Sequence, residues 1–243
     1  MVRNDYLSAI IAKILKMSQE EKNLEAAPSK KFRLDHFVED NQRQLMIAGA
    51  ALIVLAAAIW YYKAKYQPQQ EAKANNAMFM AERYFGRDSL DLALNGDGTY
   101  DGLLDIIDQY PRTKSGQRAQ YYAGVTMMKK GQYEEAIDHL KKVDFDDEMV
   151  GPLSRCLIGD SHVELDNLES AGKAYMKAAG MSQNDFTTPY ALLKAARVYS
   201  SLEQWDKALK SLKTIQSDYS NSRFAEDIDK LIARAETASL HQE

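Results

Sequence analysis

Histidine, cysteine and acidic side chains are the groups of this chain that could carry out chemistry, and their spacing limits which chemistry is open to them. The histidines His36, His139, His162 and His241 are scattered, and Cys156 is the single cysteine. A zinc site needs ligands at short spacings, and a nucleophile needs a base held close to it. The sequence contains neither pattern, nor a glycine-rich phosphate loop. We therefore predict no catalytic residue, no metal site and no cofactor, and expect that the protein is not an enzyme.

The turn-rich string NGDGTYDG, Asn95 to Gly102, places oxygen ligands at alternate positions, as a calcium loop does. Two required residues are missing. Tyr100 stands at the sixth position, where glycine makes the sharp turn, and Ile106 stands at the twelfth, where a bidentate acid belongs. We predict a turn here and no calcium binding.

Composition narrows the classes of partner. The chain has 31 basic and 35 acidic residues, a net charge of −4, and no cluster of Lys and Arg that would form a nucleic-acid surface. One cysteine excludes a disulfide within the chain. The 12 glycines and 5 prolines are few for 243 residues, which is typical of long helical runs. We expect protein partners, no nucleic acid and no small-molecule substrate.

One apolar run indicates contact with a lipid bilayer. The string LMIAGAALIVLAAAIWYY, Leu45 to Tyr62, contains no charge, and a helix of this length spans about 27 Å of the roughly 30 Å hydrocarbon core. A buried core helix would need more surrounding protein than the chain offers. A signal peptide would follow a short basic start, whereas a long polar stretch precedes this run. We predict a transmembrane helix over residues 44–62.

The N-terminal tail, residues 1–43, is mostly polar. Its apolar residues from Leu7 to Leu15 fall on one helical stripe, which fits a surface helix; alternatively, Met17 is the native start. Basic residues flank both ends of the apolar run, four before it and three after it, so charge alone does not set the orientation. The remaining residues, 63–243, form the third predicted region.

The string YYAGVTMMKKGQYEEAIDHLKKV, Tyr121 to Val143, resembles a tetratricopeptide repeat (TPR), a 34-residue helix–turn–helix unit. Gly124 stands at the eighth position, where a small residue lets the paired helices approach. Gly131 lies at the turn, where a positive φ is cheap for glycine. Two further units begin after Pro152 and Pro189. The alanines at the twentieth position, where the helices cross, are Ala136, Ala171 and Ala208, spaced 35 and 37 residues apart.

Further helical segments flank the three units. Apolar residues recur at helical spacing from Ala74 to Phe85, and Leu103 to Ser115 parallels the end of the third unit, Ser211 to Ser222. A closing helix is expected over Arg223 to Ala235, with acids on its outer face. The predicted fold class is all-α, with a single N-terminal transmembrane helix followed by a TPR-type α-solenoid.

The order of segments also resembles a family. A short tail entering a single span through FVEDNQRQL, then YYKAKYQPQQEAKA and a TPR domain, is similar to the ancillary SecYEG translocon subunit (YfgM-like) family. The resemblance covers residues from about 37 to 235. This chain departs from the family pattern in the Asn95–Gly102 insertion and in its longer N-terminal tail. It implies a bacterial inner-membrane protein with a cytoplasmic N-terminus. It also implies a periplasmic TPR domain that associates with the Sec translocon, a membrane-bound chaperone or exported clients.

The TPR resemblance implies a partner-binding groove lined by the first helix of each unit. The residues it selects are Arg118, Tyr121, Val125, Met128, Lys129, Asp160, Glu164, Tyr190, Leu193 and Arg197. A TPR carboxylate clamp, which holds a peptide C-terminus, needs Lys at the fifth and Asn at the ninth position of the repeat, and neither residue stands there in this chain. We therefore expect the groove to bind an extended or helical segment held by apolar contacts. Tyr121 and Tyr190 are either aromatic anchors for the partner or packing residues between hairpins.

Two functions remain open on the sequence. The first is a non-catalytic, membrane-anchored protein-binding module that acts in protein export or envelope assembly. The second is a structural scaffold subunit of another inner-membrane complex. The sequence does not name the client or the oligomeric state.

Overall fold

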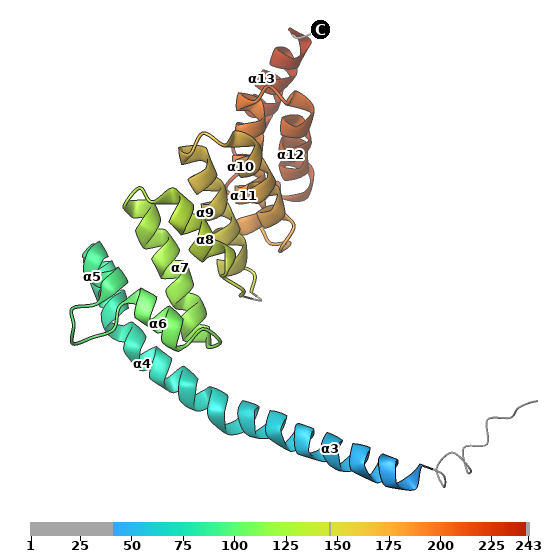
Figure 1. Ribbon diagram of the computed structural model, residues 1–243. Coiled ribbons are helices and arrows are strands. Elements are labelled where there is room, and N and C mark those ends of the chain that lie inside the picture. Colours follow the sequence, from blue (N-terminus) through green and yellow to red (C-terminus); the bar gives the residue numbers. More distant parts are fainter. Residues whose placement is uncertain (1–40, 146, 242–243) are drawn as a thin grey trace, which may run out of the picture. The chain divides into compact units, whose positions relative to one another are not determined.

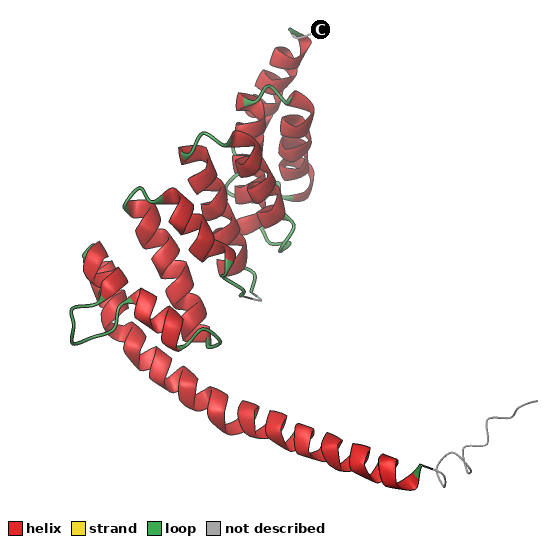
Figure 2. Ribbon diagram, in the orientation of Figure 1, coloured by secondary structure: helices red, strands yellow, loops and turns green. Residues whose placement is uncertain are grey.

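A computed structural model describes residues 41–145 and 147–241. Within these ranges every regular element is a helix, joined by turns and loops (Figure 2), so the all-α prediction is confirmed for this part of the chain. The chain divides into two compact units, Met1–Trp60 and Tyr61–Glu243. The apolar stripe and the alternative start at Met17 lie outside the described residues.

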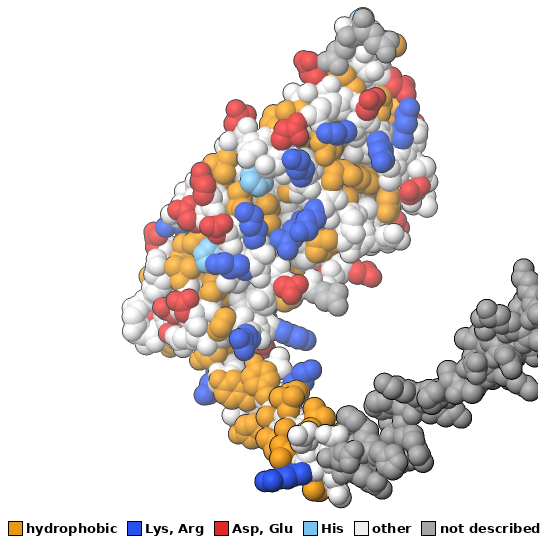
Figure 3. Space-filling model, turned by 45° about the vertical axis from the view of Figure 1, so that its right-hand side comes forward, with side chains coloured by type: hydrophobic (Ala, Val, Ile, Leu, Met, Phe, Trp, Pro, Cys, Tyr) orange, Lys and Arg blue, Asp and Glu red, His pale blue; other side chains and the backbone are white. Residues whose placement is uncertain are grey.

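Helix α3 (Gln42–Tyr61) is the element described in the first unit. None of its residues is buried, and its surface carries large hydrophobic side chains such as Ile53 and Trp60 (Figure 3). Among the described residues, one helical stretch, Gln42–Gly86, is long and apolar enough to cross a membrane, with a mean hydropathy of 2.1 over its best 18-residue window.

A short π-helix, η1 (Tyr62–Tyr66), precedes helix α4 (Gln67–Gly86). The structure places Pro68 inside the first turn of α4 and the irregular turn just before it. The N–H of Gln67 donates to the carbonyl of Tyr62, five residues earlier, which is the π-helical spacing. Pro68 has no N–H to donate, so a departure from regular α-helical bonding close to it is expected.

Helix α4 is the first helix of the second unit's core. Its predicted apolar stripe is confirmed, because Ala74, Met78 and Ala81 are fully buried. Met78 and Ala81 pack with residues such as Leu103 and Ile106 in one hydrophobic cluster. Helix α4 contacts the following three helices, which are α5 (Leu90–Asn95), α6 (Leu103–Gln109) and α7 (Lys114–Lys129).

The loop between α5 and α6 is held by one aspartate. The carboxylate of Asp97 accepts hydrogen bonds from the backbone N–H groups of Thr99 (2.9 Å) and Tyr100 (2.8 Å) and from the hydroxyl of Tyr84 (2.7 Å). These bonds hold the pKa of Asp97 below its ordinary value, with the Tyr84 hydroxyl contributing most. The string that resembles a calcium loop is therefore a turn organised by its own acid.

Helix α7 begins the repeated part of the unit, in which helical hairpins stack side by side (Figure 1). Each hairpin contacts the next through α8 and α9 or through α10 and α11. The helices that follow α7 are α8 (Tyr133–Lys141), α9 (Val150–Glu164), α10 (Leu168–Ala179), α11 (Thr187–Ser201) and α12 (Trp205–Asp218).

Small residues let the helices of each hairpin cross closely, as the repeat register predicts. An added Cβ at Gly124 would lie 2.5 Å from Cγ of Leu140, and one at Gly159 would lie 2.4 Å from the ring of Tyr175. No side chain larger than hydrogen fits at either position without displacing a neighbour. The alanines of the second helices are fully buried at the crossings: Ala136, Ala171 and Ala208.

The turn inside each hairpin uses the left-handed backbone region. Its residues are Gly131, Asp166 and Glu203, with φ of 75°, 54° and 56°. They recur at the same spacing as the buried alanines, so the three hairpins share one turn geometry. Glycine adopts this conformation readily, whereas a Cβ makes it costly. The second and third units therefore carry a strain that the first avoids.

Helix α13 (Ile228–Leu240) closes the unit against α12. The sequence predicts a helix from Arg223 to Ala235, and the structure starts it five residues later. Residues 223–227 form turns instead. Within these turns the guanidinium of Arg223 lies 4.8 Å from the ring centroids of both Phe186 and Phe224, a cation–π arrangement.

Candidate partner-binding surface

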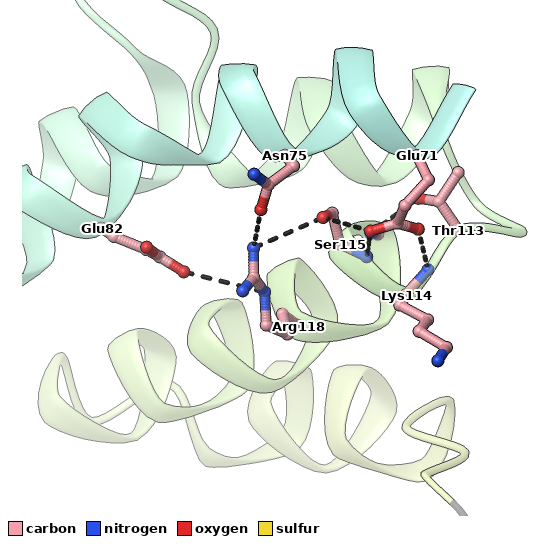
Figure 4. A network of polar contacts seen from close by, with 8 residues as sticks. Glu71, Asn75, Glu82, Thr113, Lys114, Ser115 and Arg118 are labelled. Atoms are coloured by element: carbon pink, nitrogen blue, oxygen red, sulfur yellow. Dashed lines mark hydrogen bonds and ion pairs between the residues drawn. The ribbon is translucent and has the colours of Figure 1, made fainter. Parts of the chain in front are cut away.

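Arg118, the first predicted groove residue, is engaged by α4 (Figure 4). Its guanidinium donates to Oδ1 of Asn75 (2.8 Å) and Oγ of Ser115 (3.3 Å), and its Nε lies 3.8 Å from the carboxylate of Glu82. Three partners within the unit hold this arginine in place. Its main visible role is to join α4 to α7.

Glu71 strengthens the same junction (Figure 4). Its carboxylate accepts hydrogen bonds from the backbone N–H groups of Lys114 (2.6 Å) and Ser115 (3.1 Å) and from Oγ of Ser115 (2.7 Å). The hydroxyl of Thr113 accepts another from the N–H of Gly116 (2.9 Å). A carboxylate at a helix N-terminus satisfies free donors and favours the helix dipole. A residue of α4 thus caps α7.

Tyr121 lies half-buried between hairpins. Its ring packs on a cluster formed by Ile137, Leu140 and Ile158, and lies edge-on to Tyr122 at 5.8 Å between ring centroids. Burial raises the pKa of the Tyr121 hydroxyl. The side chain of Tyr121 therefore packs between the hairpins and keeps an accessible edge that a partner can contact.

Val125, Met128 and Lys129 follow on the same helix. Val125 and Met128 are half-buried, whereas Lys129 is exposed. The ammonium of Lys129 lies 2.8 Å from the carboxylate of Asp88 and 5.0 Å from the ring centroid of Phe85. This lysine reaches back toward α4, so part of its charge is already balanced.

An open groove crosses the first helices of the three hairpins. Its volume is about 530 Å³, in the range of protein binding clefts. We call it the central groove. Its lining residues are Met128, Lys129, Tyr133, Asp160, Val163, Glu164, Tyr175 and Lys194. Four of the ten predicted groove residues are among them.

An ion pair between neighbouring hairpins forms the floor of the central groove. The carboxylate of Asp160 on α9 accepts from Nζ of Lys194 on α11 (2.7 Å) and from the hydroxyl of Tyr175 (2.5 Å). About a quarter of each charged side chain is exposed. Burial opposes the charged form of Lys194, but Asp160 outweighs it and raises the pKa of the lysine. Lys194 therefore stays charged at neutral pH, with its ammonium hydrogen-bonded inside the unit.

The other charges of the groove also have partners. The hydroxyl of Tyr133 donates to the carboxylate of Glu164 at 3.3 Å. Nζ of Lys194 lies 5.6 Å from the ring centroid of Tyr175 and 5.1 Å from that of Tyr190. The central groove is consequently mixed in charge, and no lining side chain presents a free charge alone.

Cys156 lies beneath this groove and is 1% exposed. Burial, followed by the negative charge of Asp160, raises the pKa of its thiol to about 12. Only the thiolate is a nucleophile. The side chain is therefore a packed thiol at neutral pH, and no group of His, Cys, Asp and Glu able to hold a metal occurs among the described residues.

The predicted groove residues of the third unit lie in two different environments. Tyr190 is half-buried, with its ring 5.6 Å from that of Phe224. Leu193 and Arg197 line a second hollow of about 390 Å³, between α11, α12 and α13. We call it the C-terminal pocket. Its lining residues are Leu193, Ala196, Arg197, Ser200, Ser201, Trp205, Leu212, Leu231, Arg234 and Ala235.

Comparison with protein families identifies the repeats. A tetratricopeptide-repeat model matches residues 118–143 and 190–222, and a second tetratricopeptide-repeat model matches residues 154–185. These segments coincide with the three hairpins α7–α8, α9–α10 and α11–α12. The chain carries tetratricopeptide repeats.

Solved structures agree with these TPR hairpins. Two crystal structures of nearly identical TPR-like repeats from Podosopora anserina, one of them a point variant, align with 71% of this chain and 89% of their own. Their sequence identity is 14% and their TM-score 0.51. A crystal structure of the MamA protein covers 70% of this chain and 91% of its own, at 19% identity and a TM-score of 0.48. At 14% identity, the likeness to the two Podosopora anserina structures shows the fold alone. No curated protein matches the chain in sequence.

Several residues of the two hollows were not selected from the TPR register. Lys194 is the sixth residue of its repeat and Tyr175 the twenty-fourth of the preceding one. The only signal for Lys194 is a charge inside the otherwise apolar string YALLKAA, residues 190–196. Trp205 and Arg234 were not selected because the TPR resemblance assigns the groove to the first helix of each unit, whereas these residues lie on α12 and α13.

Proposed function

We propose that this chain is a non-catalytic TPR protein that binds other proteins through the first helices of its hairpins. TPR folds typically serve as interaction scaffolds, and the observation that carries the proposal is the open central groove running across α7, α9 and α11. The ten predicted residues remain our proposal for the contact surface, with Arg118 and Tyr190 at its edges.

We further propose that the chain is anchored in a bacterial inner membrane by residues 44–62. The apolar, charge-free sequence and the helix α3 support a span, and the family resemblance supports the orientation. Residues 1–43 then lie in the cytoplasm and residues 63–243 in the periplasm. In that compartment the partners are the Sec translocon, a membrane-bound chaperone or exported clients, in protein export or envelope assembly.

Cysteine labelling tests the orientation. Cys156 is buried, so in a Cys156→Ser background a single new cysteine at the exposed Asn221 reports on the repeats, and one at Gln42 reports on the other side of the span. A maleimide that cannot cross the inner membrane should label Asn221→Cys in intact spheroplasts. Gln42→Cys should react only after lysis. The reverse pattern would place the repeats in the cytoplasm and refute the proposal.

Co-purification in mild detergent followed by mass spectrometry tests the partners. Translocon and chaperone peptides would support the export role. A different stoichiometric assembly would instead support a scaffold subunit of another inner-membrane complex, and absence of any partner would refute both.

A matched pair of substitutions tests the central groove itself. Val163 lines the groove and Met176 lies on the second helix of the same hairpin, and both are 37% exposed. Val163→Ser should reduce the amount of partner recovered, while Met176→Ser should leave it unchanged. Circular dichroism should report the same fold for both. Equal recovery from the two variants would remove the central groove from the proposal.

A further inference from the structure

The C-terminal pocket has an apolar floor and walls. Leu193 and Leu231 are half-buried, Leu212 is 3% exposed, and the ring of Trp205 adds a large flat surface. A hollow of about 390 Å³ is large enough for one or two side chains of a partner. By shape and lining, then, it suits an apolar anchor rather than an entirely polar ligand.

The charged side chains of the pocket all have the same sign. Arg197 and Arg234 both line it and both are exposed, and neither guanidinium has an acidic partner among the described residues. No Asp or Glu belongs to the lining. The indole Nε1 of Trp205 is a further donor, shielded from solvent and without an acceptor in the described part of the chain. The pocket therefore offers two cationic donors and no carboxylate to pair with them.

We propose that the C-terminal pocket binds an acidic segment of a partner protein, in which an apolar side chain is flanked by Asp or Glu. The inference rests on the proposed protein-binding function and names the chemistry of one partner segment. The apolar side chain occupies the hollow between α11, α12 and α13. The flanking carboxylates pair with Arg197 and Arg234, because guanidinium groups bind carboxylates through paired, charge-assisted hydrogen bonds.

Charge complementarity selects this occupant over a basic or neutral one. Two guanidiniums facing one hollow repel a basic segment, whereas each gains a partner when carboxylates bind. Tryptophan, tyrosine and arginine also carry much of the energy of protein interfaces, and the pocket presents one tryptophan and two arginines. The same pair of arginines would attract an anionic lipid headgroup, and the experiment must separate that outcome.

Tryptophan fluorescence gives a direct assay on the full-length protein in mild detergent. The chain has 2 tryptophans, Trp60 and Trp205, so Trp60→Phe leaves a single probe inside the pocket. The ligand is a synthetic peptide with a central Phe flanked by Asp and Glu. One control peptide replaces every acid by its amide, and a second replaces Phe by Ser. Both controls should bind more weakly than the acidic peptide.

Arginine substitutions complete the test. Arg197→Gln and Arg234→Gln should each weaken binding of the acidic peptide by about tenfold or more, since each removes a charged hydrogen-bond donor. Arg83→Gln, which removes the same charge from an exposed site on α4, should leave the affinity for the acidic peptide unchanged, because salt screens interactions between distant exposed charges. Anionic phospholipid vesicles, added in place of the peptide, should not change the Trp205 fluorescence.

Three outcomes would overturn the proposal: no binding of the acidic peptide, equal binding by the arginine variants, or a response to vesicles that exceeds the response to peptide. Failure of the pocket is distinguishable from failure of the protein-binding function. If partners still co-purify with the double arginine variant, only the pocket assignment is lost. If nothing co-purifies with the unmodified protein, the proposed function itself fails.

Discussion

The central groove and the C-terminal pocket share repeat positions but differ in their electrostatics, because the groove is mixed in charge and the pocket is positive. Asp160 and Arg197 both occupy the ninth position of a first helix. The carboxylate of Asp160 lies 2.7 Å from Nζ of Lys194 on the next hairpin, and the two form an ion pair. Arg197 meets α13, which contributes Arg234 and no acid to the lining. The ninth repeat position therefore carries a paired charge that stabilises the stack inside the array. At the end of the array the same position carries a cation without an acidic partner.

The difference follows from where each site lies in a solenoid. Inside the array every first helix faces another repeat, which can supply a counter-charge. At the end only the closing helix is present, and its polar face is selected by solubility rather than by pairing. Internal positions are thus expected to serve stability, whereas terminal ones are more available for ligands.

Overpacking the helix crossings should have the largest effect and should disturb each hollow separately. Ala136→Leu, below the central groove, and Ala208→Leu, below the C-terminal pocket, each insert a larger side chain where no space exists. We expect each to reduce the free energy of unfolding by about 1–3 kcal/mol. Thermal melts followed by circular dichroism measure the loss, and unchanged midpoints for both would mean that the register is wrong.

Charge removal sharpens the comparison directly. Asp160→Asn leaves Lys194 a quarter exposed and without its carboxylate, which we expect to cost about 2 kcal/mol, less than a fully buried pair would lose. Arg197→Gln breaks no ion pair and should change stability by less than about 0.5 kcal/mol.

A double-mutant cycle isolates the pair. Asp160→Asn combined with Lys194→Met should cost less than the sum of the two single changes, because the second substitution removes the uncompensated charge. Additive losses, or a loss for Arg197→Gln as large as for Asp160→Asn, would show that the two ninth positions do not differ as described.

Sequence periodicity predicted the repeated part of the fold well. The small residues at the crossings, such as Gly124 and Ala136, are specific because only one side-chain size fits. The candidate site was less accessible to prediction. Lys194 and Arg234 reach the two hollows from neighbouring elements, and the sequence pattern of one repeat carries no information on which charge the next element places opposite it. The late start of α13 was also not predicted; the residues before it form turns in which Arg223 contacts the rings of Phe186 and Phe224, and no local propensity records such a contact.

The turn residues offer a smaller test within the repeats. Asp166→Gly relieves a left-handed conformation at φ 54° and should stabilise the protein by about 0.5 kcal/mol. Gly131→Ala introduces the same strain at φ 75° and should cost about 1 kcal/mol, since no neighbour lies within contact of the added Cβ. Denaturant titration of both variants gives the signs, and the same sign for both would contradict the shared turn geometry.

The thiol of Cys156 gives the finest probe of the central groove, because its pKa responds to both members of the ion pair. Burial and Asp160 raise this pKa to about 12, and Lys194 lowers it. The S–H stretching band in Raman spectra should therefore persist in the folded protein at pH values where the unfolded chain has lost it. A group whose pKa is raised on folding stabilises the protein fully below its unfolded pKa, and this contribution is lost as pH rises toward the folded pKa. Stability should fall above about pH 9 more steeply than in Cys156→Ser.

Substitutions in the ion pair should move the pH at which the S–H band of Cys156 is half lost. Asp160→Asn should shift this midpoint to lower pH and Lys194→Met to higher pH. Arg197→Gln, at the other ninth position, should leave the midpoint where it is, and a shift there would mean that the two hollows are electrostatically coupled.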